Sequence, residues 1–141
     1  MIRVILPALL TAAPALAQFA PTAEERLRAL TAPPAVDLYA SEKLDDRARI
    51  AAEAEILFGP EHAAVAVFVT DNCTDCDKAL SELRALSQEL GVEMRVLPMD
   101  DPAHRAVFDR LEFDVLPAYV MPDRLIRGHM PDIVLRRYLT R

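Results

Sequence analysis

The sequence predicts one α/β domain in which helices flank a central mixed sheet. Three patterns carry this expectation: a valine-rich apolar run at 65–69, a helical spacing of apolar residues after it, and an alternation of helix and strand patterns along most of the chain. With 141 residues, of which 52% are hydrophobic, the chain can bury a core without several disulfides. The net charge of −6 argues against nucleic acid or an anionic membrane surface as the main partner.

The first 17 residues predict a signal peptide. Arg3 supplies a positive charge, residues 4–13 are largely apolar, and Ala15-Leu16-Ala17 has the small-residue pattern of a cleavage site. The apolar stretch is too short to span a membrane. We therefore expect residues 1–17 to be removed, and the mature protein to be periplasmic or secreted without membrane attachment.

Residues 18–34 predict an N-terminal arm or linker. Within this segment, Thr22 and Glu25 fit a capping box at the start of a short helix, and Pro33-Pro34 ends the pattern. The folded domain is expected over residues 35–141.

The domain is expected to open with a short strand at 36–39, where apolar and polar residues alternate. A single helix should follow over 41–58, ended by Gly59-Pro60. The run at 65–69 predicts a central strand covered on both faces. A helix then starts near Asp75 and ends at Gly91, and residues 92–97 predict a second central strand.

The last third predicts a helix, a hairpin and a final helix. Asp101 followed by Pro102 is typical of a helix start. Residues 116–121 and 124–127 predict two strands joined by a tight turn, and Pro131-Asp132 opens the final helix. This order predicts a mostly parallel sheet that ends in an antiparallel hairpin.

The two cysteines of the chain, Cys73 and Cys76, are separated only by Thr74 and Asp75. A strand that delivers a Cys-x-x-Cys pair to the start of a helix is typical of a thiol–disulfide redox site. Unpaired backbone N–H groups in the first helical turn favour a thiolate there. Two alternatives stay open: a structural disulfide, although so short a loop restrains little chain entropy, and a copper(I) site.

The other candidate residues predict no resident metal and no cofactor. Two thiolates are too few for structural zinc, and His62, His104 and His129 share no metal-ligand spacing. We expect His104 on an exposed helix face. His129 could approach the cysteines, although a surface position is favoured, and Tyr119 is expected in the core.

Three features in register resemble the thioredoxin family over residues 36–141: the strand followed by Cys73-Thr74-Asp75-Cys76, the Leu116-Pro117 step before a strand, and a hairpin followed by Gly128. The resemblance implies that Cys73 attacks and Cys76 resolves. It also implies a cis bond before Pro117, next to the sulfurs, with the backbone of Leu116 binding an extended substrate.

The activity implied by this resemblance is exchange of dithiol and disulfide with protein thiols or disulfides, without a diffusible cofactor. The alternative is a non-catalytic binding module of the same fold, or a protein that handles copper(I).

Departures from the family pattern concern the surroundings of the sulfurs. Val67 stands where the family often has a buried carboxylate, which leaves Glu93 as a candidate substitute. Asp71, Asp75 and Asp77 should each raise the cost of a thiolate at Cys73. We therefore expect a less acidic Cys73, and a less oxidising disulfide, than in the strong periplasmic oxidases. Asn72 and Thr74-Asp75 replace the family's aromatic residue and Gly-Pro.

Overall fold

The computed structural model describes residues 22–31 and 37–140, in two units that divide after Val36. In the first unit, helix α1 spans Ala23–Thr31. The N–H of Thr22 donates to the carboxylate of Glu25 at 2.8 Å, and the N–H of Glu25 donates to the Thr22 hydroxyl at 3.3 Å. These reciprocal bonds confirm the predicted capping box. The predicted signal peptide and the remainder of the arm lie outside the described residues.

The second unit is an α/β domain with a four-stranded mixed sheet, which confirms the predicted fold class. Strand order is β2-β1-β3-β4; β1 runs parallel to β2, and β3 runs antiparallel to β1 and β4. This arrangement is consistent with a thioredoxin-like fold. The elements are α2 (Ala40–Ala52), α3 (Ala54–Phe58), β1 (Val65–Val69), α4 (Cys76–Leu90), β2 (Met94–Pro98), α5 (Pro102–Arg110), β3 (Ala118–Met121), β4 (Arg124–Arg127) and α6 (Asp132–Leu139).

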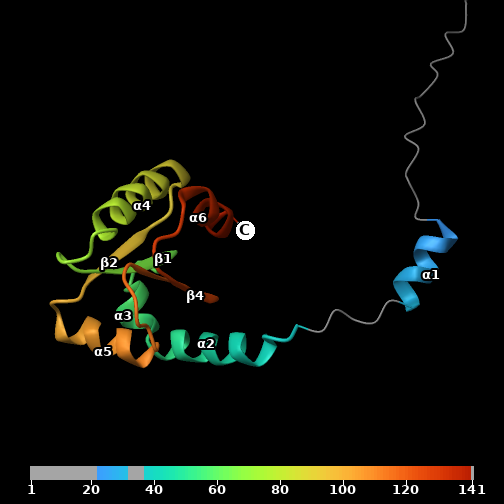
Figure 1. Ribbon diagram of the computed structural model, residues 1–141, viewed down its shortest axis with the longest axis horizontal. Helices are drawn as coiled ribbons and strands as arrows, with labels where there is room; N and C mark the ends of the chain where they lie inside the picture. The colour runs from blue at the N-terminus through green and yellow to red at the C-terminus, as the bar shows by residue number, and fades with distance from the viewer. Residues whose placement is uncertain (1–21, 32–36, 141) are drawn as a thin grey trace, which may run out of the picture. The chain divides into compact units, whose positions relative to one another are not determined.

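Helices cover both faces of this sheet. Figure 1 shows α4 and α6 on one side of the strands and α2, α3 and α5 on the other. Every residue of β1 is buried, as predicted for a central strand, and its side chains alternate between the two faces. Ala66 and Phe68 join the cluster under α2, α3 and α5, whereas Val65, Val67 and Val69 join the cluster under α4 and α6. Cys76 belongs to the second cluster, and Cys73 packs against it.

The predicted strand at 36–39 is wrong over its described residues, which form a turn leading into α2. The carboxylate of Asp37 accepts a hydrogen bond from the N–H of Tyr39 at 3.0 Å, and its carbonyl accepts one from the N–H of Ala40 at 3.1 Å. Aspartate favours such turns because its side chain can bond the backbone two residues ahead. Among the described residues β2 is an edge strand of the sheet, not the predicted second central strand. The described sheet is not mostly parallel, because two of its three strand pairings are antiparallel.

The single helix predicted over 41–58 is also wrong, because Glu53 separates α2 from α3. The Glu53 carboxylate accepts two hydrogen bonds from the guanidinium of Arg110 on α5, at 2.5 and 2.8 Å. After this break, Leu57 and Phe58 at the end of α3 are buried against the sheet. A contact with a distant helix thus coincides with a break that local spacing does not indicate.

A candidate thiol–disulfide site

The loop between β1 and α4 holds the cysteines close together. The N–H of Cys73 donates to the carbonyl of Thr70 at 3.2 Å, and the N–H of Cys76 donates to the carbonyl of Cys73 at 3.1 Å. The two sulfurs form a disulfide with a Cα–Cα distance of 5.3 Å. Because Cys76 is the first residue of α4, the bond lies at the start of a 15-residue helix, as the sequence predicts.

The two cysteines differ in exposure. Cys73 is half-buried, whereas Cys76 is 2% exposed and packs in the cluster under α4. A visiting thiolate would therefore meet Cys73 and not Cys76. This asymmetry is compatible with the roles that the resemblance implies, attack at Cys73 and resolution by Cys76.

The segment before β3 reaches the same end of the sheet. The bond between Leu116 and Pro117 is cis, which confirms the predicted geometry. Since Ala118 is paired with Phe68, Pro117 lies next to the end of β1, where the cysteine loop begins. Leu116 and Cys73 both pack, partly buried, against the cluster that contains Cys76. The structure thus brings the four predicted site residues together, while their roles stay predictions.

No carboxylate occupies the buried position beneath the cysteines. Val67 is 0% exposed there, in the same cluster as Cys76. Glu93 cannot substitute, because its carbonyl bonds the N–H of Ala64 at 2.8 Å, before the start of β1. That end of β1 is about 13 Å from the end where the cysteine loop begins, at roughly 3.3 Å per residue. The suggestion that Glu93 assists proton transfer is therefore wrong.

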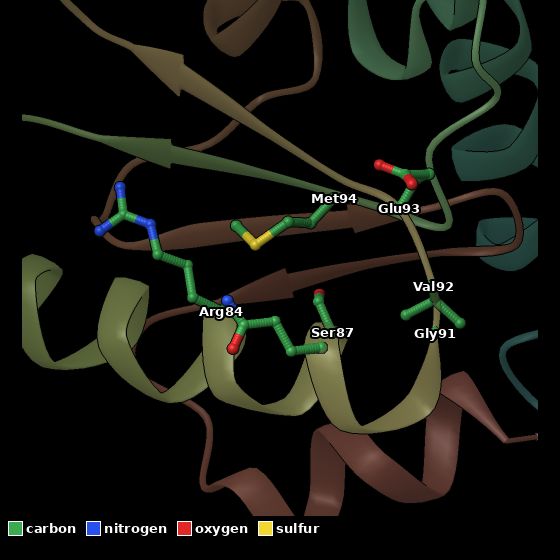
Figure 2. Close-up of a pocket in the computed structure, with 7 residues that line it drawn as sticks. Arg84, Ser87, Gly91, Val92, Glu93 and Met94 are labelled. Atoms are coloured by element: carbon green, nitrogen blue, oxygen red, sulfur yellow. The ribbon is translucent and has the colours of Figure 1, made fainter.

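Glu93 instead lines a hollow between α4 and β2, at the end of the sheet away from the cysteines. Figure 2 shows it on the loop that enters β2, beside Val92 and Met94. Arg84 and Ser87 reach this hollow from α4. It is therefore separate from the Cys73–Cys76 site.

His129 lies where β4 leaves the sheet, at the same end as Pro117, because Arg127 is paired with Ala118. Its Nε2 is 2.8 Å from a carboxylate oxygen of Glu82 on α4, and both side chains are half-buried. The contact joins the segment after β4 to the cysteine-bearing helix. No local sequence pattern indicates this contact, because 47 residues separate the two partners.

Tyr119 is fully buried, as predicted for a core aromatic. Burial raises the pKa of its hydroxyl, and the charge of Glu82 raises it further, against a lowering by the backbone of Met130. That Met130 contact falls outside hydrogen-bond geometry, and the hydroxyl has no partner among the described residues. Tyr119 is therefore poorly placed to ionise during a reaction at neutral pH.

The expectation of an exposed His104 is wrong. Its side chain is 16% exposed, and its Nδ1 is 2.9 Å from the carbonyl of Pro98. The contact attaches α5 to the end of β2. This places the loop at 99–101, which carries Asp100, beside the cysteine end of the sheet.

A second hollow, of about 360 Å³, lies beside the cysteine loop. Its lining comes from the end of β1 and the residues after it, from α4, and from β2 and the loop that follows: Val69, Thr70, Asp71, Leu80, Val96, Pro98 and Asp100. Asp71 is two residues before Cys73. The hollow could not be predicted from the sequence, because no local pattern indicates that the loop after β2 meets the loop after β1.

Over residues 22–31 and 37–140, no three or more histidine, cysteine, aspartate or glutamate side chains gather as a metal site would require. No helix in that part of the chain is both long and apolar enough to cross a membrane.

Comparison with models of protein families, with curated protein sequences and with solved structures finds no match to this chain. The mixed sheet and the Cys73–Cys76 disulfide are compatible with the thioredoxin resemblance. The geometry of the cysteine site is therefore the main evidence for the function of this protein.

Proposed function

We propose that this protein exchanges dithiol and disulfide with protein partners through Cys73 and Cys76. One observation carries the proposal: the disulfide at the start of α4 joins a half-buried cysteine to a buried one. Such a pair offers one sulfur to a partner and keeps the other ready to displace that partner.

In the oxidising direction, a thiolate of the partner attacks the sulfur of Cys73. The new intermolecular bond forms as the Cys73–Cys76 bond breaks, and Cys76 leaves as a thiolate. A second thiolate of the partner then attacks the partner's sulfur in the mixed disulfide and releases Cys73. The partner loses two electrons and two protons overall, and the protein gains them as two thiols.

The same steps in reverse reduce a partner disulfide. Cys73 attacks as a thiolate, and Cys76 then attacks the sulfur of Cys73 to release the reduced partner. Either direction needs a second dithiol–disulfide couple to restore the starting state. The sequence features that predict a signal peptide support an exported setting, where the compartment keeps such couples oxidising.

The groups around the two sulfurs favour a thiolate at Cys76 and disfavour one at Cys73. Cys76 is in the first turn of α4, whose backbone N–H groups lack helical partners and favour a leaving thiolate. Asp71 and Asp75 flank Cys73 in the sequence and disfavour a thiolate there. The cis step at Leu116–Pro117 would offer backbone groups to an extended partner segment, as the thioredoxin resemblance implies.

The test is an insulin-reduction and a scrambled-disulfide assay on the wild type, on Cys73→Ala and on Asp45→Asn. Asp45 is exposed on α2, away from the site, so its variant controls for handling and surface charge. We expect turnover in the wild type and in D45N, and none in C73A. Equal rates in wild type and C73A would contradict the proposal. Absence of any turnover, together with tight copper(I) binding by the reduced protein, would favour the copper-handling alternative.

A further inference from the structure

The hollow beside the cysteine loop has an apolar floor and an acidic edge. Val69 is 7% exposed, and Leu80 and Val96 are half-buried, so these side chains form its apolar part. Asp71 and Asp100 are exposed and come from two loops that meet at the hollow. A volume of about 360 Å³ is near the lower end for ligand pockets and is large enough to admit one long side chain.

The two carboxylates are not neutralised within the described domain. Neither Asp71 nor Asp100 forms an ion pair or a side-chain hydrogen bond among residues 37–140. Arg105 on α5 donates to the carbonyl of Met99 instead, at 2.7 and 3.2 Å. Lys78 at the start of α4 lies 3.8 Å from Glu82. Negative charge at this edge is thus available to a partner.

We propose that this hollow selects partners that carry a lysine or arginine next to the reactive cysteine. The inference rests on the proposed exchange at Cys73 and names its substrate class. Lysine and arginine have an apolar stem and a charged head. The stem would cover Leu80 and Val96, and the head would meet Asp71 and Asp100.

The same edge disfavours acidic partners. Asp75 and Asp77, on either side of Cys76, are exposed and add to the negative charge of the loop. A glutamate next to the partner's cysteine would face the carboxylates of Asp71, Asp75, Asp77 and Asp100. Against these four negative charges stands the guanidinium of Arg105, which donates to the carbonyl of Met99. Selection therefore comes from attraction of partners with a basic residue next to the cysteine and repulsion of partners with an acidic one.

The test uses three short reduced peptides that differ only beside their two cysteines, where each carries lysine, glutamine or glutamate. The oxidised protein is mixed with each peptide, and loss of the Cys73–Cys76 disulfide is followed in a single turnover. We expect the lysine peptide to react about tenfold faster than the glutamate peptide at low salt, which two exposed ion pairs can supply. The ratio should fall as salt rises, because screening weakens exposed pairs.

The double variant D71N/D100N should lower the lysine-to-glutamate ratio at least threefold, which a partial loss of exposed ion pairs can produce. The matched control D45N/D109N removes the same charge at exposed positions on α2 and α5, and should leave the ratio unchanged. The ratio is the readout because a general change in cysteine reactivity affects every peptide alike and cancels.

The outcomes separate the two proposals. Equal rates for the three peptides, or a ratio that D71N/D100N leaves unchanged, would overturn the selection while exchange at Cys73 stands. A failure of all three peptides to react with the wild type would overturn the exchange and the selection together.

Discussion

Cys73 and Cys76 share one disulfide, but Cys73 is half-buried and Cys76 is 2% exposed. The difference follows from the local fold. Cys73 lies in the turn that leaves β1, whereas Cys76 begins α4 and faces the core with Ala79 and Leu83. Because Cys73 is the more exposed of the two cysteines, we expect a partner to contact Cys73 first.

We expect an alkylating agent to modify Cys73 of the reduced protein at least about tenfold faster than Cys76, because reaction needs an accessible thiolate. The measurement is peptide mapping after a brief treatment with limiting iodoacetamide. Protein unfolded in guanidinium serves as the control, where the two rates should converge. Faster modification of Cys76 in the folded protein would reverse the assigned roles.

We expect the domain to stay folded when the disulfide is reduced. The bridge spans a sequence separation of three, and the chain-entropy relation gives it only about 2 kcal/mol. Urea unfolding should therefore give one cooperative transition for the oxidised protein and one for the reduced protein. The free energies of unfolding of the two forms should differ by about 2 kcal/mol or less. The double variant C73A/C76A should behave like the reduced protein. Loss of the folded state on reduction would indicate a structural disulfide instead.

The ion pair between Glu53, at the break between α2 and α3, and Arg110 on α5 should make the free energy of unfolding depend on pH. Hydrogen bonds from Arg110 lower the pKa of Glu53 below its ordinary value of 4.5. A carboxyl with a lowered folded-state pKa stabilises the fold above its ordinary pKa, and this stabilisation is lost as the pH falls through the lowered value. Glu53→Gln should therefore lower the unfolding temperature by a few degrees at neutral pH, and by progressively less in acid.

The control for this measurement is Glu55→Gln, the same change at an exposed position of α3. E55Q should follow the wild type across the pH range. A constant difference between E53Q and the wild type from neutral pH to strong acid would show that the ion pair with Arg110 is not the cause.

The centre of the fold could be predicted from the sequence because its signals are local. The valine run gives β1, the apolar spacing with Gly91 gives α4, and the Asp101-Pro102 pair gives the start of α5, where the Asp101 side chain accepts from Ala103 at 2.8 Å. The Cys73–Cys76 pair was found from its motif, and the cis bond before Pro117 was predicted from the resemblance to the thioredoxin family.

The elements that were predicted wrongly depend on side-chain hydrogen bonds that apolar spacing does not reveal. Asp37 uses its side chain to form a turn where alternation suggested a strand. Glu53 is bonded to α5, 57 residues further on, and no periodicity reports such a contact. The hollow lined by Asp71 and Asp100 likewise arises only when two distant loops meet.

The redox potential of the Cys73–Cys76 couple, measured by equilibration with reduced and oxidised glutathione, tests the central claim most directly. An exchanging disulfide should titrate as one reversible two-electron couple with a potential above about −300 mV, and C73A should show no such transition. A couple that stays oxidised in every glutathione mixture, with a potential below about −300 mV, would be a structural bridge and would contradict the proposed exchange.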